Sequence, residues 1–434
     1  MKMGERGAGC AMMCARMSID DEIAAICSRA KEASRRLAYA SSEKRQAVLL
    51  VLAKELRART PEVLVANALD VAAAKERGLS AAMIDRLALT AVGIEAIAKG
   101  VEEIALLPDP VGEVVSDVRR PNGLRVRRVR VPLGVIAMVY ESRPNVTIDA
   151  AALCLRVGDA AVLRGGSEAR NSNLAFAKLI ASALSKEALP IDAIQLVTTP
   201  DRDAIRALVQ QVGTVDLAIP RGGEALVRFV TEHARVPVVQ HYKGVCHTYI
   251  DGGVSAVVAR DIVINAKLSR PAVCNALECL LVDAKVAEEV LPVIAEALAR
   301  GGCEIRGCER TCELVPSARR ALDSDYGTEF LDRVLAVRVV DGIDAAIDHV
   351  ARFGSGHTEA ILTSDEAHAE RWRREVDAAC VMVNASTRFH DGGELGLGAE
   401  IGIATSRLHW RGPMGAESLT TFKWVVDGTG QTRI

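Results

Sequence analysis

The chain has 434 residues, of which half are hydrophobic, a quarter are charged and only 3% are aromatic. Its formal net charge of −2 gives no bulk electrostatic attraction for nucleic acid or an anionic membrane, and no apolar run is long enough to span a bilayer. A chain of this length is expected to fold as two or three domains.

The N-terminal part of the chain is expected to be helical. Residues 1–17 lack an apolar core long enough for a signal peptide, so we expect a disordered extension there. Ser18 then starts an S-x-x-D pattern ahead of apolar residues at helical spacing, which predicts a capped amphipathic helix. Helical patterns continue through 43–59 and 61–77 to about residue 107.

The pattern changes after Pro108. Apolar and basic residues alternate around Asn122 and Gly123, which predicts a β-hairpin at 115–131. From Val131, four strand–helix units follow one another, and a second strand–helix set follows Cys274. The sequence therefore predicts an α/β protein with a Rossmann-type parallel sheet and a second α/β domain. The four arginines of the second hairpin strand have no interleaved aromatic residues, which favours a solvated face or a subunit contact over nucleic-acid binding.

Candidate ligand sites lie where strands end, because parallel sheets bind ligands outside the carboxyl ends of their strands. RGGSEA (164–169) and PRGGEA (220–225) each link a strand to a helix, and paired glycines let backbone amides approach a phosphate. Such turns are also common without a ligand. Asn145 could donate to an oxyanion or cap the following helix.

The cysteines raise a separate question. Eleven scattered cysteines, an odd number, favour free thiols in a reducing cytoplasm over a disulfide framework. Cys303, Cys308 and Cys312 fit no common zinc spacing, so no metal site is expected, and the scattered histidines are expected to be structural. Cys274 lies on a connection before an apolar run, where either a nucleophile or a packing residue is consistent with the pattern.

Five stretches together closely resemble the gamma-glutamyl phosphate reductase family, a branch of the aldehyde dehydrogenase superfamily. They are VPLGVIAMVYESRPNVTIDAAALCLRVGDAAVLRGGSEA, DLAIPRGGEALVRFV, VCHTYID, SRPAVCNALECLLV and MVNASTRFHDGGELGLGAEIGIATSRLHWRGPMGAESLTTFKW, and the resemblance extends over residues 18–434. It implies NADPH-dependent reduction of L-glutamyl 5-phosphate to L-glutamate 5-semialdehyde and phosphate, the second step of proline biosynthesis from glutamate.

The resemblance also implies roles for individual residues. Cys274 would attack the acyl phosphate and form a thioester, with Asn145 in the oxyanion hole. The cofactor would be bound by Arg164, Ser167, Glu168, Gly222, Gly223 and Glu329. The substrate's phosphate or α-carboxylate would meet Arg143, Arg270, Ser386, Thr387 and Arg388, although salt bridges that close a domain interface explain the arginines equally well.

One departure from the superfamily pattern separates the alternative functions. Hydrolytic aldehyde dehydrogenases carry a glutamate base in a stretch that here reads VQHYKGVCHTYID, with no Glu or Asp before Asp251. This absence disfavours a hydrolytic enzyme, and nothing in the sequence identifies a CoA site for a CoA-acylating one. A non-catalytic scaffold of this fold is a third alternative, but a scaffold needs none of Cys274, Asn145 and Glu329.

The resemblance finally implies an architecture and an assembly. It places an NADPH-binding domain at 18–265, interrupted by the hairpin, a catalytic domain at 266–411, and a C-terminal strand at 412–434 that pairs with the hairpin as an oligomerisation arm. We expect a cytoplasmic homo-oligomer, a dimer or a tetramer, that acts on a small molecule and binds neither nucleic acid nor membrane. Association with glutamate 5-kinase is left open.

Overall fold

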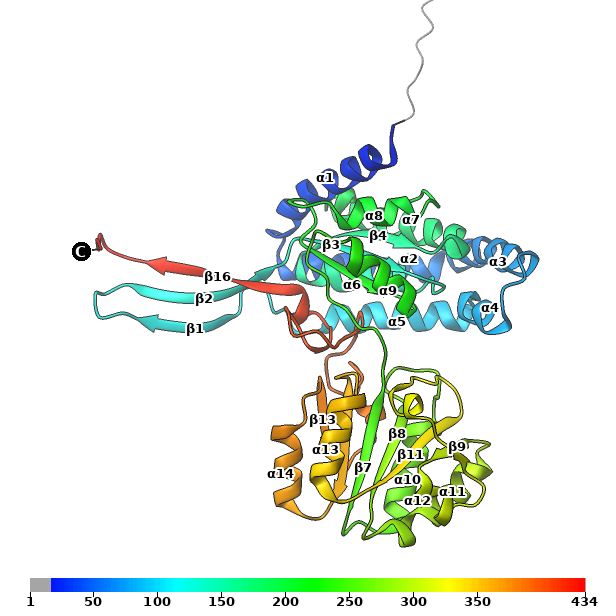
Figure 1. The fold of residues 1–434 in the computed structure, drawn as a ribbon. Helices are drawn as coiled ribbons and strands as arrows, with labels where there is room; N and C mark the ends of the chain where they lie inside the picture. Colours follow the sequence, from blue (N-terminus) through cyan, green and yellow to red (C-terminus); the bar gives the residue numbers. More distant parts are fainter. Residues whose placement is uncertain (1–16, 434) are drawn as a thin grey trace, which may run out of the picture.

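The computed structural model describes residues 17–433, so the disordered extension expected at 1–17 lies, apart from Met17, outside the described residues. The described chain forms two parallel sheets, each covered by helices on both faces, and a separate three-stranded antiparallel sheet (Figure 1). The α/β fold predicted from the sequence, with a Rossmann-type domain and a second α/β domain, is confirmed.

The N-terminal helices begin as the sequence predicts. Ser18 caps α1, and its hydroxyl accepts a hydrogen bond from the backbone N–H of Asp21 at 3.1 Å. The helices that follow bury their apolar faces against the first sheet or against one another. They are α1 (Ile19–Leu37), α2 (Ser42–Ala58), α3 (Thr60–Glu76), α4 (Ala81–Leu87) and α5 (Ala91–Leu106).

The first sheet has four parallel strands in the order β5-β4-β3-β6. Alternate residues of the central strand β3 enter two different cores: Ile136 and Met138 pack under α2, α5, α6 and α7, whereas Val135 and Ala137 pack under α1, α8 and α9. The elements are β3 (Val135–Tyr140), α6 (Val146–Val157), β4 (Ala160–Gly165), α7 (Arg170–Lys186), β5 (Ile194–Leu196), α8 (Asp203–Val209), β6 (Leu217–Arg221) and α9 (Glu224–His233).

The strand order changes direction at β3, because β4 lies on one side of it and β6 on the other. The loops that follow β3 and β6 therefore diverge and leave room between them, which is where ligands bind in open parallel sheets. Arg143 and Asn145 follow β3, and Arg221, Gly222 and Gly223 end or follow β6. Five residues of interest thus meet at one edge of the sheet.

The second sheet has seven strands in the order β10-β9-β11-β8-β7-β12-β13, all parallel. Helices α10, α11 and α12 cover one face, and α13 and α14 cover the other. The elements are β7 (Cys246–Gly252), α10 (Ala256–Leu268), β8 (Leu277–Asp283), α11 (Ala287–Arg300), β9 (Glu304–Gly307), α12 (Glu309–Leu314), β10 (Arg319–Arg320), β11 (Val334–Val340), α13 (Gly342–Phe353), β12 (Thr358–Thr363), α14 (Glu366–Glu375) and β13 (Cys380–Val383).

This sheet starts earlier in the chain than the expected boundary between 265 and 266. Strand β7 lies at its centre, hydrogen-bonded to β8 on one side and β12 on the other, and α10 packs against α11. The physical reason is burial: residues 246–250 are buried, and such a strand needs partners on both edges. The chain therefore passes from the first sheet to the second before Cys246.

The predicted hairpin is present, and the C-terminal strand joins it. Strand β1 (Val114–Arg119) pairs with β2 (Arg125–Pro132), and β16 (Thr420–Asp427) pairs with the other edge of β2 from Thr420 opposite Pro132 to Asp427 opposite Arg125. Figure 1 shows this arm extending away from both sheets. The short strands β14 (Ile403–Ala404) and β15 (Gly412–Pro413) pair before it in the chain.

The arginines of β2 are engaged within the arm. Arg125 is paired with Asp117, Arg127 with Asp427, and Arg130 with both Glu113 and Glu417, while the guanidinium of Arg128 stacks on Phe422. All of these contacts lie within one copy of the chain. The nine cysteines in the described part of the chain are free thiols. No helix between residues 17 and 433 is both long and apolar enough to cross a bilayer.

A buried ion pair joins the two elements on either side of Cys274. The ammonium of Lys267, in the last turn of α10, lies 2.5 Å from the carboxylate of Glu278 at the start of β8, and both side chains are 0% exposed. Glu278 also accepts a hydrogen bond from the backbone N–H of Leu331. Because a buried charge without a partner is very unfavourable, the pair fixes both ends of the connection between these elements.

Replacing Lys267 with Met should strongly destabilise the protein, because the carboxylate of Glu278 would stay buried without its cation. We expect the free energy of unfolding, measured by urea denaturation, to fall by about 3–5 kcal/mol. The double variant K267M/E278L should recover most of this loss, since no buried charge remains. As a control, R228M breaks the exposed pair with Glu224 and should leave the free energy of unfolding almost unchanged. A K267M variant as stable as R228M would contradict the interpretation.

Candidate active site

Cys274 lies in the turn between α10 and β8, at the amino end of the second sheet and near the carboxyl end of the first. The N–H of Ala276 donates to the carbonyl of Val273 at 3.0 Å, which closes a turn around the cysteine. Cys274 is half-buried and therefore not sealed inside a core. Gly244, on the segment that links the sheets, packs so closely that a Cβ there would overlap the Cys274 carbonyl.

The segment after β13 clamps the residue that follows the cysteine. The amide of Asn275 donates to the carbonyls of Arg388 (3.3 Å) and His390 (2.9 Å), and its oxygen accepts from Arg388. The hydroxyl of Thr387 donates to the Asn275 carbonyl at 2.7 Å. Ser386 caps the short helix Thr387–Phe389. Ser386, Thr387 and Arg388 are thus next to the cysteine turn, and their polar groups hold it in place.

Arginines gather around Cys274 from three loops. Arg221 ends β6, Arg143 follows β3, and Arg270 lies in the turn itself. The pKa of Arg143 is lowered overall, first by partial desolvation and then by the neighbouring cations Arg221, Arg86 and Arg270. The nearby Cys274 opposes this shift. None of the three forms an ion pair with any residue between 17 and 433, so their positive charge is available to an anion.

Burial and charge act in opposite directions on the thiol. Desolvation raises the pKa of Cys274 to about 11, the Arg221 guanidinium opposes this rise, and the carboxylates of Glu400 and Glu329 add to it. At neutral pH the resting group is therefore a thiol, and its proton must leave as the sulfur attacks. Arg221, which the sequence analysis did not select, is the cation that favours the thiolate.

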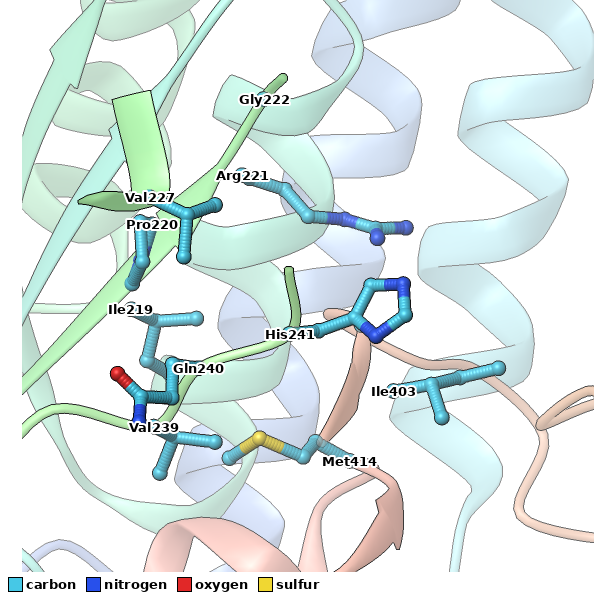
Figure 2. Close-up of a pocket in the computed structure, with 11 residues that line it drawn as sticks. Ile219, Pro220, Arg221, Gly222, Val227, Val239, Gln240, His241, Ile403 and Met414 are labelled. Atoms are coloured by element: carbon cyan, nitrogen blue, oxygen red, sulfur yellow. The ribbon is translucent and has the colours of Figure 1, made fainter. Parts of the chain in front are cut away.

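Two histidines lie beside the thiol. His241 and His357 each present a ring nitrogen, and these two atoms and the Cys274 sulfur all lie within 4.8 Å of one another. Figure 2 shows the side chains of His241 and Arg221 extending into the same cavity, which Ile403 and Met414 also line. The expectation that the histidines are only structural does not account for this convergence.

Asn145 occupies the N-cap position directly before α6, but its side chain does not cap the helix. Its amide donates instead to the carboxyl of Asp149 at 2.8 Å. Desolvation raises the pKa of Asp149 to about 6, while Asn145 and Arg221 act in the opposite direction. The capping role considered for Asn145 is thus absent, and its amide is held on the side of α6 that faces Arg221.

A second cavity lies at the carboxyl ends of β4 and β5. Gly165, Gly166, Ser167, Arg170 and the loop 198–200 line it. Arg164 frames the cavity rather than entering it, because its guanidinium donates to the carbonyls of Gly165, Pro200 and Asp201. Glu168 is likewise engaged: its carboxylate accepts from the N–H (2.6 Å) and hydroxyl (3.0 Å) of Ser142.

The remaining candidate cofactor residues are Gly222, Gly223 and Glu329. Gly222 lines the cavity that holds His241, and Gly223 precedes α9 with open space where a side chain would be. Burial raises the pKa of Glu329, the backbone N–H of Gly244 and Lys243 oppose the rise, and Glu329 in turn acts on Cys274. Glu329 is therefore close to both the linking segment and the thiol.

The structure corrects one inference about carboxylates. The stretch before Asp251 contains none, but Glu329 and Glu400 come close to Cys274 from distant parts of the chain. Glu400 is held by the N–H of Gly392 at 3.0 Å and lies near Arg221. The absence of an acidic residue in the local sequence thus does not mean that the site lacks carboxylates. Arg221 ends β6 and His241 lies on the segment that links the two sheets, and no local spacing in the sequence marks either residue.

Comparison with known proteins identifies relatives over almost the whole chain. Residues 11–306 match the family model described as "Aldehyde dehydrogenase family". The gamma-glutamyl phosphate reductase of Sorangium cellulosum is 57% identical over 422 residues, covering 96% of this chain and 99% of that protein. The enzyme of the same name from Desulfatibacillum aliphaticivorans is 52% identical over 417 residues, covering 96% of this chain and 100% of that protein.

Solved structures give the same result. The crystal structure of gamma-glutamyl phosphate reductase from Thermotoga maritima superposes with a TM-score of 0.94 at 43% identity, covering 95% of this chain and 100% of that one. An acetylating aldehyde dehydrogenase from Geobacillus thermoglucosidasius superposes with a TM-score of 0.68 at 18% identity, covering 96% and 98% of the two chains. The second likeness concerns the fold alone.

Replacing Arg221 with Gln should slow alkylation of Cys274 by iodoacetamide several-fold at pH 8, because the charge that develops on the sulfur loses its nearby cation. The rate is measured on the Cys274 peptide by mass spectrometry, which separates it from the other thiols. R228Q removes an exposed arginine from neighbouring α9 and serves as the control. Equal rates in R221Q and the wild type would show that Arg221 does not act on the thiol.

Proposed function

Because the chain belongs to the aldehyde dehydrogenase family and, within it, to the gamma-glutamyl phosphate reductases, we propose that it reduces L-glutamyl 5-phosphate to L-glutamate 5-semialdehyde and phosphate in proline biosynthesis. The single observation that carries this proposal for the chain's own residues is the half-buried Cys274 between two sheets, surrounded by three arginines without ion pairs in the described structure. A nucleophile among unpaired cations suits an activated, anionic acyl donor.

The sulfur of Cys274 attacks the γ-carbonyl carbon of the acyl phosphate, its S–H bond breaks, and the C–O bond to phosphate breaks to leave a thioester. The backbone N–H of the cysteine and the amide of Asn145 stabilise the oxyanion, once the amide turns from Asp149. After reduction of the thioester, the tetrahedral oxyanion collapses to aldehyde and the sulfur leaves as thiolate. Asn275 and Thr387 hold the cysteine turn in one position throughout.

The residues at the ends of β4, β5 and β6 fit a dinucleotide, whose bound nicotinamide supplies the hydride. Gly165, Gly166 and Ser167 line the cavity in which an adenosine would lie, with Arg164 and Glu168 fixing the surrounding loops. Gly222 and Gly223, at the start of α9, would meet the pyrophosphate once it displaces the Glu141 carboxylate, which accepts from the Gly223 N–H at 3.1 Å. Glu329 would hold the nicotinamide ribose near Cys274.

The form of the cofactor in this proposal is NADPH. Its additional phosphate calls for a cation beside the adenosine ribose, and Arg170 is an exposed side chain that lines this cavity. It forms no ion pair with residues 17–433, so its charge is available to the 2′-phosphate.

The substrate carries two anionic groups, the phosphate and the α-carboxylate, and different arginines would bind each of them. Arg221, Arg143 and Arg270 approach Cys274 and would bind the phosphate that leaves from the reacting carbon. Arg388, whose Nε is buried without a hydrogen-bond partner, is also next to the cysteine turn and would meet the α-carboxylate. Ser386 and Thr387 position Arg388 in this proposal and do not bind substrate themselves.

The arm and the cell compartment complete the proposal. Val118, Trp424 and Val426 are 48%, 65% and 53% exposed on the three-stranded arm, which would bury them against a second copy of the chain in a dimer or tetramer. Free thiols agree with a cytoplasmic location. Because acyl phosphates are short-lived in water, association with glutamate 5-kinase would deliver the substrate directly.

The reaction can be tested in reverse, because the aldehyde is more stable than the acyl phosphate. With glutamate 5-semialdehyde and NADP supplied, NADPH absorbance should rise only when phosphate is present, since phosphate must release the acyl group from Cys274. C274S should lose activity by about 10³-fold or more. Turnover that does not depend on phosphate would instead indicate a hydrolytic dehydrogenase, and turnover that requires CoA would indicate a CoA-acylating one.

Replacing Arg270 with Ala should weaken phosphate binding without unfolding the protein, because its side chain is exposed and forms no ion pair within 17–433. We expect the KM for phosphate in the reverse assay to rise about tenfold, which corresponds to roughly 1.4 kcal/mol. Urea denaturation of R270A should match the wild type. A loss of stability with an unchanged KM would assign Arg270 to the domain interface.

A further inference from the structure

The environment of Cys274 lacks an assigned acceptor for its proton. The resting group is a thiol, so the S–H bond must break during attack, and the released proton needs a base within reach. Glu400 is engaged by Gly392 and Arg221, Asp149 by Asn145, and Glu329 by the backbone N–H of Gly244 and by Lys243. The two imidazoles of His241 and His357 are the other basic groups that lie beside the sulfur within the described chain.

Each of the two imidazoles has one ring nitrogen without a hydrogen-bond partner in the described part of the chain. The Nδ1 of His241 and the Nε2 of His357 are buried and have no hydrogen-bond partner. An unsatisfied buried polar atom costs about 1–3 kcal/mol, which a fold retains where the atom has another use. The distance to the sulfur, up to 4.8 Å, is closed by one water or by a small rotation of the His241 side chain.

The two histidines differ in their freedom to move and in their access to solvent. His357 is 0% exposed, and its Nδ1 is held by the hydroxyl of Thr358 at 2.6 Å, which also contacts His390 at 2.7 Å. His241 is half-buried, lines the cavity with Arg221, and forms no side-chain hydrogen bond to residues 17–433. A base that must take up and return a proton needs this access, which favours His241.

The charges around the cluster favour proton transfer over metal binding. A thiolate and two imidazoles are suitable zinc ligands, but Arg221 acts on all three groups, and Arg143 and Arg270 also lie beside the cysteine. A divalent cation would be repelled by these guanidinium groups. A neutral imidazole is instead favoured there: desolvation, Arg221 and His390 lower the pKa of His241 to about 4.

We propose that His241 is the catalytic base that accepts the thiol proton of Cys274 during attack on the acyl carbon. The electron pair of the S–H bond forms the new C–S bond, the proton moves to the free imidazole nitrogen, and phosphate leaves. When the aldehyde is released, the imidazolium returns the same proton to the thiolate. The acyl step rests on the proposed function, whereas the pairing of His241 with Cys274 is a property of the free protein.

The test uses iodoacetamide alkylation of Cys274, which needs neither substrate nor cofactor. In the wild type the rate should fall with decreasing pH only to a flat plateau set by the reaction that His241 assists, since His241 is neutral above about pH 4 and the thiol is intact below about pH 11. In H241Q only the thiolate reacts, so the rate should rise about tenfold per pH unit and be about 10²-fold lower at pH 7. H233Q, which removes a half-buried histidine from α9, should behave as the wild type.

Two further variants separate a catalytic role of His241 from a structural one, and His241 from His357. H241A should regain part of its alkylation rate when imidazole is added, which a merely structural role would not allow. H357Q should keep the flat pH profile. The proposal is overturned if H241Q keeps the wild-type profile, or if H357Q loses it while H241Q does not. An enzyme that fails the phosphate-dependent assay but shows the His241-dependent profile would refute the proposed function and leave this pairing intact.

Discussion

The geometry of the site depends on the buried ion pair between Lys267 and Glu278. It joins the end of α10 to the start of β8, so the turn that carries Cys274 cannot lengthen or shift without separating two charges in the protein interior. Asn275 adds a second restraint by hydrogen-bonding the segment after β13. The thiol is thereby fixed where groups from both sheets approach it: Arg221 from the first and His357 from the second.

The same burial that fixes the cysteine also makes it unreactive at rest. Desolvation raises the pKa of its thiol, and Glu329 and Glu400 raise it further. Arg221 is the side chain that lowers this pKa most. A permanently ionised thiolate would require stronger cationic support than this arrangement gives. Reactivity therefore has to arise during the attack itself, through removal of the thiol proton as the new bond to sulfur forms.

Much of the fold could be predicted from the sequence, because apolar periodicity and turn residues are local properties. The capped start of α1, the hairpin around Gly123 and the alternating units after Val131 all depend on neighbouring residues. The position of β7 in the second sheet could not be predicted, since no change in composition marks where the chain passes from one sheet to the other. Arg221 and His241 were missed for a similar reason: they meet Cys274 only when loops from both sheets converge, and no local spacing records that convergence.

The arginines also bear on which acyl acceptor the site selects. Water exceeds millimolar phosphate by roughly ten thousand-fold, so phosphate must be favoured by about 5.5 kcal/mol to compete for a thioester. An arginine about 4 Å from an anionic charge contributes about 4 kcal/mol at an effective dielectric constant near 20. Two such arginines acting on a phosphate dianion exceed the required preference, whereas neutral water gains nothing from them. In the proposed function, the unpaired charges of Arg143, Arg221 and Arg270 would therefore favour phosphate over water as the acyl acceptor, even though Glu329 and Glu400 lie near the thiol.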